Sequence, residues 1–123
     1  MSKVAMLHEK DPRENLIAAA GDLSNFELLN NELLVAIYLR PEKTSGGIIL
    51  TAKNLEEDLY QSKAHLVLKI GPTADFPTIQ IAVHDWILLR PSDAYSLDVN
   101  GVSCRLVQDK YVRAKISKPD IVW

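Results

Sequence analysis

The sequence predicts an all-β domain, a small β-barrel that follows an N-terminal arm containing one short helix. From Leu33 onward, short segments rich in branched and aromatic residues alternate with proline, glycine and Asn-Gly turn signals. Asp11 to Gly21 carries a helix signature with start and stop residues. The length of 123 residues fits one domain with one core. We divide the chain into an arm (1–31), a barrel (32–117) and a tail (118–123).

The arm is expected to hold a helix of two to three turns. Asp11 can accept hydrogen bonds from the first free amides, Pro12 suits the first helical position, and Glu14 stands where a capping-box acid belongs. Gly21 supplies the left-handed residue that ends many helices. A helix this short is not stable alone in water. Its apolar side chains must therefore pack on the barrel or on a neighbouring subunit; they are Leu16, Ile17 and Ala20.

Several strands follow the arm. Segment 33–40 is apolar on both faces, as in a strand buried between a core and an interface, so a monomer would expose a sizeable patch and we expect a homo-oligomer. Segment 64–71 alternates, and its pattern places Leu66, Leu68 and Ile70 on one face. Further strands are expected at 79–83, 86–90 and 110–116.

The clearest local prediction is a hairpin over 95–107. Asn100-Gly101 is typical of a type I′ turn, which needs positive φ at both central residues. The resulting register pairs Val99 with Val102, Leu97 with Cys104, and Tyr95 with Leu106, all on one face, and places Ser96, Asp98, Ser103 and Arg105 on the other. We therefore expect the thiol of Cys104 to face the core.

Composition and motifs argue against several classes of protein. A net charge of −2 without runs of like charge does not fit a nucleic-acid binder. No signal peptide and no apolar run of membrane-spanning length is recognised, and a single cysteine fits a reducing compartment. Cys104 lacks metal-ligand spacing to His8, His65 or His84, and a thiol on an apolar face would be inert. No phosphate-binding glycine motif is present, so we expect no catalytic residue, metal or cofactor.

Four stretches resemble a known family in the same order. They are K-T-S-G-G-I-I-L-T (43–51), I-G-P (70–72), V-H-D-W-I-L-L (83–89) and R-L-V-Q-D-K-Y-V-R-A-K-I (105–116). With them, the chain from about Glu32 to Ile116 resembles the GroES-like co-chaperonins. The resemblance implies that the first stretch belongs to a loop, 41–63, that docks on a chaperonin ring. It also implies a symmetric oligomer.

The chain also departs from that pattern. About 30 residues precede the first strand, an acidic N-L-E-E-D-L-Y-Q stretch (54–61) follows the loop motif, and the 71–83 connection is short where bacterial members carry a roof hairpin. His84 stands where the family has a glycine. These departures are similar to those of divergent GroES-like proteins from tailed bacteriophages.

The apolar triplet after the Gly-Gly pair has two interpretations. It can be an ordinary strand start, or a hydrophobic hook for a partner; the hook would consist of Gly46, Gly47, Ile48, Ile49 and Leu50. Burying three such side chains is worth roughly 1.5–3 kcal/mol each, whereas ordering the loop costs roughly 1–2 kcal/mol per residue. One hook would therefore bind weakly, and a ring of copies would compensate through avidity.

Two functions follow. We expect no enzymatic activity, because no group of residues with catalytic spacing supports one. The arm, the apolar tail and the short roof segment favour a phage capsid decoration protein on the virion surface, bound to the major capsid protein. Its expected anchors are Leu16, Ile17, Ile121, Val122 and Trp123, because aromatic and aliphatic anchors dominate interfaces. The alternative is a phage-type co-chaperonin that caps a host or phage chaperonin through the hook and assists folding of the capsid protein.

Overall fold

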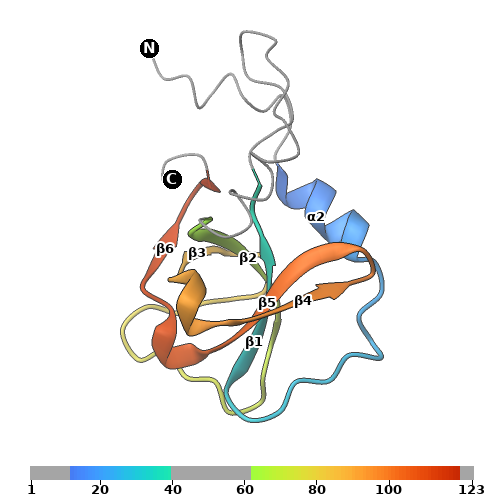
Figure 1. Ribbon diagram of the computed structural model, residues 1–123. Helices are drawn as coiled ribbons and strands as arrows, with labels where there is room; N and C mark the ends of the chain where they lie inside the picture. The colour runs from blue at the N-terminus through green and yellow to red at the C-terminus, as the bar shows by residue number, and fades with distance from the viewer. Residues whose placement is uncertain (1–11, 40–61, 120–123) are drawn as a thin grey trace, which may run out of the picture.

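The computed structural model describes residues 12–39 and 62–119, which form one curved antiparallel sheet and a single α-helix (Figure 1). The sheet has six strands in the order β4-β5-β1-β2-β3-β6. The strands are β1 (Glu32–Ile37), β2 (Ala64–Ile70), β3 (Trp86–Leu88), β4 (Tyr95–Val99), β5 (Val102–Gln108) and β6 (Ala114–Ile116). Two 3-10 turns, η1 (Pro91–Asp93) and η2 (Asp109–Tyr111), connect them. The predicted all-β class with one short helix is confirmed.

The described part of helix α2 (Pro12–Ala20) ends as its sequence signature predicts. Gly21 has φ +67° and its amide donates to the carbonyl of Ile17 at 3.1 Å. Asp11, the expected N-cap, lies outside the described residues. Ala20 is buried, and Leu16 and Ile17 pack against the core beneath the helix. The helix thus covers the sheet of its own chain.

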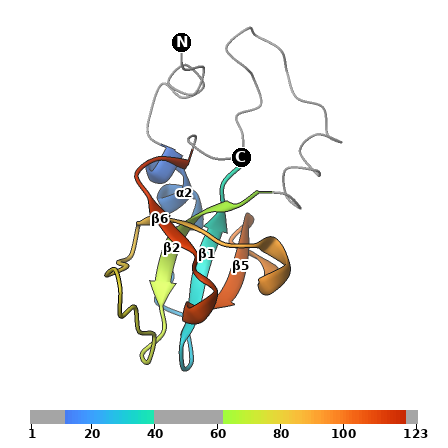
Figure 2. The ribbon, with the colours of Figure 1, turned by 90° about the vertical axis from the view of Figure 1, so that its left-hand side faces the viewer.

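Strand β1 lies between β2 and β5, and both of its faces are covered (Figure 2). On the helix side, Leu34 and Ala36 belong to a core that includes Tyr38, Leu66, Trp86 and Cys104. On the opposite side, a second core consists of Leu33, Val35, Val67, Ile81, Ile87, Leu89 and Val107. The two-sided apolar pattern of β1 is therefore satisfied within one chain and does not by itself require a partner subunit.

Strand β2 contains a bulge that shifts its alternation. Leu34 pairs with Lys69, but the next residue, Val35, pairs with Val67. The extra residue on β2 moves later side chains to the other face. The prediction that Ile70 shares a face with Leu66 and Leu68 is therefore wrong, because Ile70 packs against the second core.

The bulge also gives Lys69 a structural role. Its ammonium group donates to the carbonyls of Leu23 and Phe26, at 2.8 and 2.5 Å. These bonds hold the segment between α2 and β1 against the sheet.

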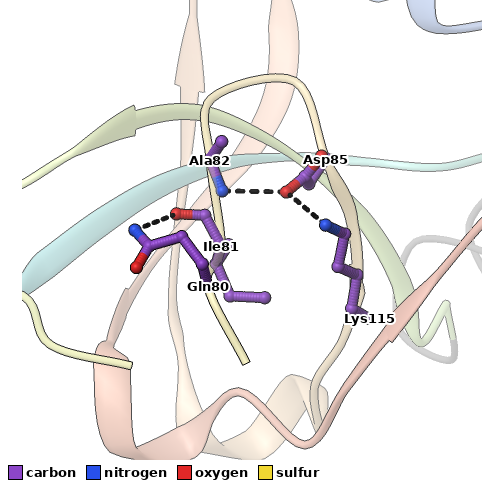
Figure 3. Close-up of polar contacts among 5 residues, drawn as sticks. All are labelled: Gln80, Ile81, Ala82, Asp85 and Lys115. Carbon is purple, nitrogen blue, oxygen red and sulfur yellow. Dashed lines mark hydrogen bonds and ion pairs between the residues drawn. The ribbon is translucent and has the colours of Figure 1, made fainter. Parts of the chain in front are cut away.

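The predicted strand at 79–83 is absent, and the chain there forms an irregular connection with a turn at 82–85. Figure 3 shows the reason: the Asp85 carboxylate accepts from the Ala82 amide at 2.8 Å and pairs with Lys115 on β6 at 3.3 Å. The Asp85 amide donates back to the Ala82 carbonyl at 3.1 Å. These local turn bonds occupy the backbone amide and carbonyl of Ala82, two of the groups that a strand over 79–83 would use. Strands β3 and β6 are also shorter than predicted.

The β4–β5 hairpin has the predicted register and turn. Val99 pairs with Val102, and Leu97 with Cys104. The φ angles of Asn100 and Gly101 are +51° and +82°. Cys104 is fully buried in the helix-side core, as expected.

Candidate partner-binding site

The predicted hook and most of the predicted anchors lie outside the described residues. These are Gly46, Gly47, Ile48, Ile49 and Leu50 in the loop, and Ile121, Val122 and Trp123 in the tail. Leu16 and Ile17 are described, and both are half-buried against the helix-side core of their own chain. Their role as anchors on a partner stays a prediction.

The two ends of the segment 40–61 are held together at one end of the sheet. The Tyr38 amide donates to the Ala64 carbonyl at 3.1 Å, which extends the β1–β2 ladder beyond both strands. The Ser62 hydroxyl donates to the Tyr38 carbonyl at 2.5 Å and is fully buried. The segment therefore leaves and re-enters the sheet at adjacent points.

A buried polar pair lies beside this point of exit. Arg105 on β5 and His65 on β2 are 2% and 0% exposed, and Nη1 of Arg105 lies 2.6 Å from Nε2 of His65. The same Nη1 donates to the Ser62 carbonyl at 3.2 Å. Nδ1 of His65 lies 3.0 Å from the Lys63 carbonyl. A carbonyl only accepts, so Nδ1 carries the proton and Nε2 accepts from Arg105.

The surroundings of His65 favour the neutral form of its imidazole. Burial, and secondarily the charge of Arg105, lower the pKa of His65 to about 3. Burial also lowers the pKa of Arg105. The imidazole therefore serves as a neutral acceptor and donor in a network that ends on the backbone at Ser62 and Lys63.

The sequence did not reveal this pair. Strand alternation places Arg105 correctly on the face opposite Cys104, but alternation does not show whether that face is covered. His65 and Arg105 are 40 residues apart, and no local motif joins them.

A second surface feature is a groove of about 660 Å³ at the β4 edge of the sheet. It is lined by residues 26–29 together with Tyr95, Leu106 and Tyr111. Leu29 and Tyr95 are 70% and 69% exposed, high values for large apolar side chains. Such side chains on an edge strand are typical of contact surfaces.

The described ranges also bear on metal binding, thiol reactivity and membrane insertion. Across residues 12–39 and 62–119, no cluster of three or more potential metal ligands occurs. Burial raises the pKa of Cys104 to about 11, so its thiol is protonated at neutral pH. No helix in the described part of the chain is long and apolar enough to cross a membrane.

Comparison with known proteins identifies the family. The family model of the chaperonin 10 kDa subunit matches residues 25–116, three quarters of the chain, and includes β1, the hook motif and every later strand. No curated protein matches the sequence. The match confirms the resemblance read from the four motifs, and membership of this family implies oligomerisation. The chain belongs to the chaperonin 10 family of GroES-like proteins.

Proposed function

We propose that the protein is a co-chaperonin that caps a chaperonin chamber and docks through the hook, Gly46 to Leu50. The observation that carries this proposal is the continuous family match across 40–61, whose two ends the structure holds side by side at Tyr38 and Ser62. A segment anchored at both ends to a rigid sheet can present a short apolar sequence to a groove on a partner.

The hook alone would bind weakly, so the proposal requires several copies in one assembly. Within the described residues, β4 and β6 are the two edges of the sheet and each pairs with one neighbour. Leu29 and Tyr95 expose apolar surface at the β4 edge. Head-to-tail contacts between unlike edges generate a ring when the rotation closes. The two-sided apolar pattern of β1 no longer argues for self-association. The two edges of the described sheet and the exposed side chains of Leu29 and Tyr95 are the features that support it.

A second candidate is a decoration protein on a phage capsid, bound to the major capsid protein. The observation in its favour is the absence of any strand between Gly71 and Asp85, where a cap would need a roof hairpin. We rank it second because α2 packs on its own sheet. Leu16 and Ile17 are thus used within the chain, and anchoring on a capsid would depend mainly on residues 1–11 and 120–123.

The two functions are separated by co-sedimentation with a bacterial chaperonin plus nucleotide, and separately with undecorated capsids. The key variant replaces Ile48, Ile49 and Leu50 with serine. A control replaces Ile79, which is 57% exposed outside the hook. We expect the wild type and Ile79→Ser to bind the chaperonin, and the triple variant to lose binding while its far-UV circular dichroism is unchanged.

Two outcomes would overturn the assignment. Chaperonin binding that survives the triple substitution would exclude the hook as the docking element. A wild type that ignores the chaperonin but binds capsids, and loses them when 1–11 or 120–123 is deleted, would establish decoration. The tail deletion stops after Pro119 because that side chain is fully buried.

A further inference from the structure

A buried polar cluster joins three strands where the segment 40–61, which contains the proposed hook, leaves and re-enters the sheet. It consists of Arg105 on β5, His65 on β2, and the chain ends at Tyr38 and Ser62. We propose that Arg105 and His65 are positioning residues, which set the direction in which this segment leaves the sheet. The inference rests on the proposed function for its binding readout, but not for its structural one.

The geometry connects a remote strand to the segment. In the sheet order, β1 separates β5 from β2, so the Arg105 side chain spans β1 to reach His65 and the Ser62 carbonyl. Arg105 pairs with Val35 and His65 with Ile37, two residues apart on β1 and hence on the same face. The guanidinium thus lies over the C-terminal residues of β1, Val35 to Ile37, directly before the chain leaves the sheet.

Besides the contact between Arg105 and His65, three hydrogen bonds in the cluster end on backbone carbonyls. Arg105 donates to the Ser62 carbonyl, His65 bonds the Lys63 carbonyl, and the Ser62 hydroxyl donates to the Tyr38 carbonyl. Hydrogen bonds are directional, so these contacts set the orientation of the peptide planes at 62 and 63. Lys63 is in turn tied to the residue that follows β3, because its carbonyl accepts from the Leu89 amide at 3.1 Å.

Stability alone does not account for this cluster. Burying a guanidinium and an imidazole costs free energy, and well-packed apolar residues of similar volume often stabilise a protein equally well or better. The surrounding face is otherwise apolar, with Val35, Val67 and Ile87 in the same core. The polar pair therefore adds what apolar packing lacks, a defined orientation of the chain at the segment's return point. A segment whose direction is already set loses less conformational entropy when it docks.

The test compares three variants of the full chain. Arg105→Met with His65→Leu replaces the pair by apolar residues of similar size, so no charge is left buried without its acceptor. His65→Gln is the conservative control, because its amide can accept from Arg105 and donate to the Lys63 carbonyl. Ser62→Ala removes the bond to Tyr38 and serves if the double variant does not fold. Thermal unfolding and amide hydrogen exchange at 62–65 are measured first, followed by chaperonin affinity.

We expect the double variant to unfold within a few degrees of the wild type, to exchange faster at 62–65, and to bind at least about tenfold more weakly, since small losses per hook multiply across a ring. His65→Gln should keep wild-type exchange and affinity, and Ser62→Ala should fall between the two. A folded double variant with wild-type exchange would overturn the inference. Faster exchange with unchanged chaperonin affinity would also overturn it. If the wild type itself does not bind, the proposed function fails, while the exchange data still decide whether the cluster orders the segment's base.

Discussion

Asn100, in the turn of the β4–β5 hairpin, donates its side-chain amide to the backbone carbonyl of Ala20 at 2.6 Å. Ala20 is the last residue of α2, where carbonyl groups lack partners within the helix. Asn100 therefore occupies a left-handed position of the turn and also caps the helix that covers the sheet.

Asn100→Gly separates these two roles. Glycine accepts the positive φ of the turn but has no donor, so the variant should lose about 0.5–1.5 kcal/mol of stability. Asn100→Asp, which also tolerates the turn but cannot donate, should lose at least as much. Urea denaturation measures both values, and hydrogen exchange should quicken along α2. Two variants as stable as the wild type would mean that the Ala20 bond contributes nothing.

The depressed pKa of His65 predicts a dependence of stability on pH. The neutral imidazole is favoured in the folded protein, with a pKa of about 3, whereas the unfolded chain binds the proton near 6.5. The contribution is complete above pH 6.5 and is lost as the pH falls towards 3. At pH 5 the protein should be about 2 kcal/mol less stable than at pH 7, since one pKa unit is worth about 1.4 kcal/mol.

The His65→Gln variant is the control for this titration. It should flatten the stability profile between pH 6.5 and 4. Backbone bonds, chiefly from Asp75, lower the pKa of Asp109, so its stabilising contribution is lost only below about pH 4. A wild-type profile that stays flat down to pH 4 would contradict a buried, neutral His65.

Gly71 and Gly101 are required for different reasons, and substitution by asparagine distinguishes the two reasons. A Cβ on Gly71 would lie 2.5 Å from the Asn30 carbonyl oxygen and 2.7 Å from that of Glu32, so Gly71→Ala should cost about 1–3 kcal/mol. Gly101 has φ +82° but open space around it, so Gly101→Ala should cost about 1 kcal/mol through backbone strain. Asparagine tolerates positive φ and should restore stability at 101 only. Equal recovery at both positions by denaturant unfolding would refute the steric account of Gly71.

His84 occupies a backbone position that favours glycine. Its φ is +75°, its side chain is exposed, and its amide donates to the Val67 carbonyl at 2.7 Å. Relief of about 1–2 kcal/mol of left-handed strain exceeds the entropic cost of glycine, so His84→Gly should stabilise the protein by up to about 1 kcal/mol. His84→Val should destabilise it. Thermal unfolding of the pair gives the answer, and a destabilised glycine variant would show that the imidazole has a structural role.

The sequence by itself determined the features that neighbouring residues encode. Gly21 ends the helix, and Asn100-Gly101 sets the hairpin register and with it the burial of Cys104. The hook motif and the later stretches pointed to the family that the family model identifies. Turn dihedrals, helix ends and side-chain alternation depend on residues a few positions apart, so they can be read along the chain.

Only the tertiary structure decided which faces are covered and where alternation fails. The bulge in β2 turns Ile70 to the second core, and in the 79–85 connection Ala82 bonds within a turn anchored by Asp85. Both faces of β1 are buried because α2 and the later strands return to it. The burial of Arg105 beside His65 follows from the same cause. The environment of each of these residues is made by segments far away in the sequence, and no local pattern carries that information.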